Sequence, residues 1–129
     1  MAMLESIKFS FVNFYKFSGR TRRSEFWFFV LAWFIVDIGL VLGLTFLSKL
    51  IEKPVFAGDT LFSTFGMIGF FAFSIYLYLA LLSSMVRRLH DSNISGSFVF
   101  IGIIPFIGFV VLIYLLCRNS VNEDNQYDP

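Results

Sequence analysis

Three long runs of apolar residues divide the chain, and short polar segments separate them. The first, residues 26–47, extends over 22 positions and contains one charged residue, Asp37. The other two, residues 61–86 and 98–117, extend over 26 and 20 positions and contain none. A helix needs about 20 apolar residues to cross the hydrocarbon core of a bilayer. The pattern therefore predicts an all-α integral membrane protein with three transmembrane helices.

The segment before the first run, residues 4–17, is also patterned. Four of its apolar residues recur at helical spacing: Leu4, Ile7, Phe11 and Phe14. Lys8 and Lys16 can extend toward lipid phosphates, so we expect a short amphipathic helix that lies in the membrane interface. Alternation of apolar and polar positions around Phe9 leaves a strand as the alternative.

A proline interrupts the third run. Pro105 has no N–H group and clashes with the carbonyl of Ile101, so a helix over 98–117 should be kinked there. The alternative is a re-entrant hairpin. Only 12 apolar residues follow Pro105, and they form about 18 Å of helix, too short for a separate crossing. We therefore favour one kinked crossing.

The composition supports a membrane protein. Of the 129 residues, 57% are hydrophobic and only 15% are charged, whereas soluble domains are about half apolar and about a quarter charged. No low-complexity segment interrupts the runs, so residues 1–129 are predicted to form a single membrane domain. Cys117 is the only cysteine, which excludes an intrachain disulfide.

Lysine and arginine are distributed unevenly along the chain. With three crossings, seven of them fall on the side of the N-terminus and three on the other side. Positive residues accumulate on the cytoplasmic side of membrane proteins. The sequence therefore predicts a multi-pass protein with its N-terminus in the cytoplasm and its C-terminal tail outside.

Two features of the first run suggest separate roles. Asp37 lies near the middle of the predicted helix, where an acid costs about 2.5–3.5 kcal/mol on insertion scales. It is a candidate for proton or cation transport, or for a polar contact with another helix, for instance at Ser74. Gly39 and Gly43 form a G-x-x-x-G motif, which allows close helix packing and self-association.

The polar stretch "VRRLHDSNISG", residues 86–96, carries the strongest concentration of candidate chemistry. His90 and Asp91 invite an acid–base interpretation, but the sequence contains no metal-binding cluster and no nucleophile motif to accompany them. Adjacent residues also seldom point at one spot. We therefore favour a helix end followed by a turn over a catalytic site, and we expect no cofactor and no bound metal.

A second polar stretch, "GRTRRSEFW" at residues 19–27, falls on the same predicted side of the membrane. The two stretches combine five arginines with two possible counter-ions and the histidine: Arg20, Arg22, Arg23, Glu25, Arg87, Arg88, His90 and Asp91. The planar arginine fork suits carboxylate and phosphate better than lysine does. We expect these residues to form a polar cluster that pairs internally or holds anionic head groups.

Four motifs also resemble a known family: "FSGRTRRSEFWFF" (17–29), "RRLHDSNISG" (87–96), "IPFIG" (104–108) and "NQYDP" (125–129). They are similar, in order, to those of the YhaH/YhaI-type bacterial inner-membrane family, which is catalogued as a domain of unknown function. The resemblance implies a small polytopic protein of the bacterial inner membrane, so the predicted outer tail is periplasmic. It implies no enzymatic activity.

The family's polar signature falls on the residues of the predicted cluster together with Gly19, Ser95 and Gly96. Two departures affect what can be carried over. Asn93 and Ile94 replace a glycine and a basic residue, and no glycine follows Tyr127. These departures weaken the expectation of a particular turn geometry and of a specific role for the tail.

The sequence thus leads to a non-enzymatic membrane module. Its predicted partners are membrane lipids with anionic head groups, a second copy of the chain or another membrane protein. Nucleic acid is not expected, because lipid phosphates lie closer to the arginines. The alternative is a small transporter or channel subunit that uses Asp37, and a membrane enzyme that uses His90 and Asp91 ranks third.

Overall fold

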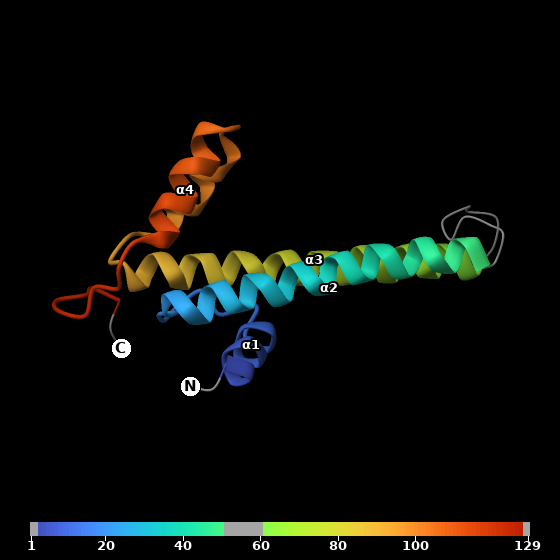
Figure 1. Cartoon of the computed structure of the whole chain (residues 1–129), viewed down its shortest axis with the longest axis horizontal. Helices are drawn as coiled ribbons and strands as arrows, with labels where there is room; N and C mark the ends of the chain where they lie inside the picture. The colour runs from blue at the N-terminus through green and yellow to red at the C-terminus, as the bar shows by residue number, and fades with distance from the viewer. Residues whose placement is uncertain (1–2, 51–60, 128–129) are drawn as a thin grey trace.

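The computed structural model describes residues 3–50 and 61–127, which are helical apart from the connecting segments and the tail (Figure 1). The elements in chain order are α1 (Met3–Val12), α2 (Arg23–Leu50), α3 (Leu61–Asp91), the 3₁₀ helix η1 (Gly96–Ile103) and α4 (Ile107–Cys117). No strand occurs in these ranges. The all-helical prediction is confirmed, and the strand alternative near the N-terminus is wrong.

Helices α2 and α3 form a long antiparallel pair (Figure 1). Their 28 and 31 residues correspond to about 42 and 46 Å of helix, enough to cross a bilayer. Only 6% and 11% of their most apolar windows are buried inside the structure. A core helix of a soluble protein would be mostly buried, so the outward apolar surfaces indicate lipid around this pair. Two of the three predicted spans therefore have the length and surface that crossing requires.

Helix α1 packs across the pair with its polar side inward. Ser6, Ser10 and Asn13 are buried, whereas 75% of Leu4 and 60% of Val12 are exposed. An amphipathic helix of a soluble protein turns its apolar side inward, so α1 has the reverse orientation. The small serine side chains allow α1 to approach the other helices closely. The helix ends at Val12, five residues earlier than predicted, and its amphipathic, interfacial placement stays a prediction.

Aromatic side chains fill the junction of α1, α2 and α3. Phe29 is fully buried, and its ring lies 5.0 Å, edge to face, from that of Phe11. The hydroxyl of Tyr76 donates a 2.8 Å hydrogen bond to the Phe11 carbonyl, and the Trp33 indole donates one of 2.8 Å to the Leu77 carbonyl. Each polar aromatic tip thus finds a backbone acceptor, which its burial requires.

The third predicted span is not one kinked helix, and that prediction is wrong. η1 and α4 pack against each other as a hairpin that projects from the end of the α2–α3 pair (Figure 1). A Cβ added to Gly102 of η1 would lie 2.9 Å from Leu112 of α4. The chain reverses at Pro105 and Phe106, where Phe106 adopts a left-handed φ of 59°. Pro105 therefore marks a turn between two short helices, because its missing N–H and the left-handed residue both end η1 there.

Because the chain reverses at this turn, the tail lies at the same end of the α2–α3 pair as the N-terminal segment, and not at the opposite end as the predicted crossing required. Arg88 of α3 donates to the carbonyls of Leu116 and Arg118 at the end of α4. Arg20, which precedes α2, donates to the Val121 carbonyl at 2.7 Å. The tail therefore lies with the N-terminal segment, and the prediction that the two are on opposite sides is wrong.

Gly108 offers a direct test of the hairpin. A Cβ at this position would lie 1.9 Å from the carbonyl oxygen of Ile101, so Gly108→Ala must push η1 and α4 apart. We expect a loss of about 1–3 kcal/mol in the free energy of unfolding in mixed micelles, the usual cost of overpacking. Gly69→Ala is the matched control, because no atom lies within 4 Å of its added Cβ. Equal stability of the two variants would contradict the hairpin.

Candidate functional site: a buried polar clamp at the end of the helix pair

The carboxylate of Asp91, the last residue of α3, joins two arginines. One oxygen accepts from Arg88 at 2.6 Å, and the other accepts from Arg20 at 3.0 Å. Only 3% of the Asp91 side chain and none of the Arg88 side chain is exposed. Buried charges are tolerated only when paired and hydrogen-bonded. We call Arg20, Arg88 and Asp91, with the backbone groups they bind, the polar clamp.

Arg88 links the clamp to the hairpin. Its Nε donates to the Leu116 carbonyl at 3.0 Å, and Nη2 donates to the Arg118 carbonyl. The last carbonyls of a helix lack partners within the helix and carry the negative end of its dipole. A cationic side chain of α3 therefore holds the C-terminal end of α4.

The tail closes over the clamp. The Ser120 hydroxyl donates to Asp91, and the Val121 N–H donates to the Asp91 carbonyl at 2.8 Å. The buried Asn125 side chain donates to the His90 carbonyl at 3.0 Å. The tail thus occupies backbone acceptors that α3 leaves free at its end.

His90 is engaged with the tail. Its ring stacks on that of Tyr127, with centroids 4.0 Å apart and planes 8° from parallel. Its Nδ1 is buried and has no hydrogen-bond partner among the described residues. The carboxylate of Asp91 faces the arginines instead, so the two adjacent residues form no acid–base pair.

Arg87 lies apart from the clamp, against α1. It is 1% exposed, its Nε donates to the Ser83 carbonyl at 3.3 Å, and its guanidinium lies 5.2 Å from the ring centre of Phe9. The carbonyl of Arg87 accepts from the N–H of Thr21 at 3.2 Å. Stacking on Phe9 and the backbone bond from Thr21 therefore fasten α1 and the segment before α2 to α3, while Nη1 and Nη2 of Arg87 are buried without a hydrogen-bond partner in the described part of the chain.

The other predicted cluster residues lie at the start of α2. Glu25 accepts from the backbone N–H of Arg22 at 3.2 Å, the carboxylate half of a capping box, so it caps a helix and pairs with no arginine side chain among the described residues. Arg23 donates to the Asn119 side chain in the tail. The guanidinium of Arg22 forms no bond within the described residues. The predicted cluster thus separates into the clamp, the exposed cations Arg22 and Arg23, and three residues engaged elsewhere: Glu25, Arg87 and His90.

Asp37 and the glycine motif lie on α2, away from the clamp. Asp37 is half-buried and forms no hydrogen bond or ion pair within the described residues, so the suggested contact with Ser74 is absent. Gly39 and Gly43 are exposed, and no atom lies within 4 Å of an added Cβ at either. Self-association through this face stays a prediction.

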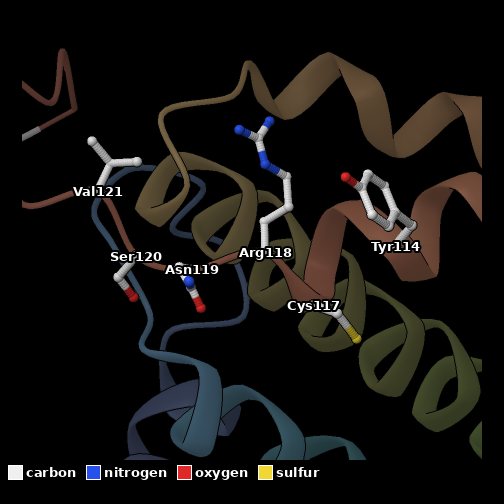
Figure 2. A pocket seen from close by; sticks show the side chains of 6 residues that line it. All are labelled: Tyr114, Cys117, Arg118, Asn119, Ser120 and Val121. Atoms are coloured by element: carbon white, nitrogen blue, oxygen red, sulfur yellow. The ribbon is translucent and has the colours of Figure 1, made fainter.

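A shallow hollow of about 420 Å³ lies beside the clamp, where α4 passes into the tail (Figure 2). Its lining residues are Tyr114, Cys117, Arg118, Asn119, Ser120 and Val121. Figure 2 shows the Arg118 guanidinium extending to the opposite side of the backbone from the Asn119 and Ser120 side chains. Within the described residues this guanidinium is unpaired. Arg118 therefore places an unpaired cation at the C-terminal end of α4, next to the hollow.

The long apolar helices and the buried polar end define a helical membrane protein. The chain belongs to the family described as "Protein of unknown function (DUF805)", whose model matches residues 14–129. Inner membrane protein YhaI of Escherichia coli is 34% identical over 119 residues, which cover 91% of this chain and 88% of YhaI. Inner membrane protein YhaH of Escherichia coli is 31% identical over 117 residues, with the same shares. No solved structure matches the chain.

The tail contributes contacts to the candidate site that the sequence reasoning did not assign. Ser120, Asn125 and Tyr127 all touch the end of α3. The one signal was the similarity of "NQYDP" to the family's ending. The predicted crossing of 98–117 placed this ending on the far side of the membrane and hid the contact.

Removing the clamp's carboxylate should cost more than any exposed substitution. In Asp91→Asn the buried Arg88 and the partly buried Arg20 lose their counter-ion, and breaking a buried pair in this way costs about 3–5 kcal/mol. We expect that loss in the free energy of unfolding in mixed micelles. Glu123→Gln, in the exposed tail, is the control and should change stability by about 0.5 kcal/mol or less. If both variants unfold like the wild type, Asp91 does not hold the fold.

Proposed function

We propose that the protein is a non-enzymatic membrane module that binds anionic lipid head groups with the exposed arginines around the polar clamp. The observation that carries the proposal is that some of the arginines are buried inside the protein whereas others are exposed. Arg20 and Arg88 are hydrogen-bonded inside the protein and Arg87 is buried against Phe9, whereas Arg22 and Arg118 have exposed side chains without partners among the described residues. A phosphate suits the guanidinium fork.

The position of these cations relative to the apolar helices favours lipid as the source of the phosphate. Arg22 immediately precedes α2, and Arg118 immediately follows α4, so both stand where apolar helices begin or end. Basic residues at such boundaries attract anionic lipids, by about 1 kcal/mol each. The clamp supports binding indirectly, since it holds the start of α2 and the tail together.

The same charges support an orientation. With two crossings, eight of the ten lysines and arginines fall on the side of both termini and only Lys49 and Lys53 on the other. The positive-inside rule then favours a cytoplasmic N-terminus and a cytoplasmic tail. Head groups of the inner leaflet are accordingly the proposed ligands.

The test is lipid binding by the variant Arg22→Gln/Arg118→Gln. Two lost cations correspond to about 2 kcal/mol, so the affinity for phosphatidylglycerol in nanodiscs should fall on the order of tenfold or more. Raising the salt concentration should weaken the wild type toward the variant, because exposed charges are screened. Native mass spectrometry of co-purified lipid and titration with labelled phosphatidylglycerol both measure this loss.

Lys49→Gln is the matched control, since it removes an exposed cation from the far end of α2. It should retain wild-type binding of lipid at the clamp end. Unchanged phosphatidylglycerol affinity in the double variant would refute the proposed function. A variant that binds weakly but unfolds like the wild type would support it, because neither arginine side chain forms a hydrogen bond or ion pair within the described fold.

A further inference from the structure

The hairpin of η1 and α4 has an unusual surface for an element that projects from the end of the molecule. No charged residue occurs between Asp91 and Arg118. Its most exposed side chains gather at the turn, where the exposed fraction is 76% for Ile103, 88% for Phe106 and 73% for Ile107. A helix that is apolar on all sides is stable only inside a protein core or in lipid. The described chain offers no core at this turn.

The turn is also adapted to a medium without water. The N–H of Ile104 donates to Ile101, that of Ile107 to Pro105, and that of Gly108 to Ile104. Pro105 has no N–H group to satisfy. Unpaired backbone groups cost several kcal/mol in hydrocarbon, and irregular backbone is excluded there unless it is satisfied. With these three donors bonded and a proline at the tip, few N–H groups of the turn remain unpaired within the described residues, that of Phe106 among them, so most of the turn suits acyl chains.

The length of the hairpin limits how far it can extend into the hydrocarbon core of a bilayer. The 8 residues of η1 extend about 16 Å, and the 11 residues of α4 extend about 16 Å. The hydrocarbon core is about 30 Å thick, so even an upright hairpin reaches only its middle. Figure 1 shows the hairpin inclined to the α2–α3 pair, with its free end leaning toward the middle of the pair.

The contacts at the base of the hairpin determine from which side of the membrane it enters. Arg88 binds the end of α4, and a Cβ on Gly96, the first residue of η1, would lie 2.6 Å from Val86 of α3. Both arms thus start at the C-terminal end of α3, beside the polar clamp. We propose that the hairpin is a one-leaflet element, which inserts its turn among the acyl chains of the leaflet nearest both termini and never reaches the other leaflet.

This insertion goes beyond head-group binding and does not depend on it. The surface that contacts lipid is the apolar turn, whereas the proposed head-group ligands are arginines at the base. A hairpin confined to one leaflet displaces lipid there without displacing it in the other leaflet. The protein would therefore occupy unequal areas of the two leaflets.

Depth and sidedness together test the proposal. In a Cys117→Ser background, Phe106→Cys carries an NBD label in vesicles of phosphatidylcholine and phosphatidylglycerol. We expect lipids with a spin label on the acyl chain to remove more of its emission than lipids labelled on the head group, and we expect protection from aqueous dithionite. A label on Phe98→Cys, near the base, should show the opposite preference. Ile107→Cys, also highly exposed, repeats the test at a second position of the turn.

Three further single-cysteine variants in the same background show on which side of the membrane each labelled position lies. Ser18→Cys and Glu123→Cys should react with an impermeant maleimide from one side of the membrane, and Lys49→Cys from the other. Reaction of Glu123→Cys from the side of Lys49→Cys would overturn the proposal in favour of a crossing. A turn label quenched by dithionite would place the hairpin in water, and a label protected from both lipid and water quenchers would place it against another protein chain. Either result also overturns the proposal, whatever the arginine variants bind.

Discussion

The buried carboxylate of Asp91 is the point on which the described structure depends. It neutralises Arg88, which has no exposed side-chain surface, and pairs with Arg20 from the segment before α2. Through Arg88 it also stabilises the end of α4, and through Ser120 it holds the tail. One charged group thus connects elements that lie far apart in the sequence. If the carboxylate were absent, two arginines would remain without a counter-ion in a largely water-free site, which is why its removal should be costly although burying the pair itself carries a desolvation cost.

This arrangement inverts the organisation of a soluble domain. The largest fully buried side chains include Arg87 and Arg88, while many leucines, isoleucines and phenylalanines are exposed along α2, α3 and the hairpin. Lipid removes the penalty for exposing apolar groups, so hydrophobic burial no longer decides which face turns inward. Polar pairing and close packing decide instead, as the inward serines of α1 illustrate. In the proposed function, exposed arginines at the clamp end face head groups, and apolar side chains face acyl chains.

The all-helical membrane class and two of the spans could be predicted from the sequence, because apolar runs of this length with almost no charge are typical of membrane-crossing helices. The two arginine-rich segments were also expected to lie together. The hairpin was weighed only as the alternative to a kinked crossing, because Pro105 in an apolar run of 20 residues is compatible with both a kink and a reversal. The choice between them depends on tertiary contacts, namely that of Gly108 with Ile101 and the binding of Leu116 by Arg88. Glu25 was assigned to arginine pairing although its position suits a capping box, and the tail contacts could not be foreseen once the tail was placed across the membrane.

The most direct test of this account is a double-mutant cycle between Arg88 and Asp91. The free energies of unfolding of Arg88→Gln, Asp91→Asn and the double variant, measured in mixed micelles, give the coupling between the two side chains. Residues in one buried network show coupling of about 0.5–3 kcal/mol, and we expect a value near the upper end, with the double variant more stable than the sum of the single losses predicts. Losses that add to within about 0.3–0.5 kcal/mol, as they do for independent sites, would contradict the central role of the clamp.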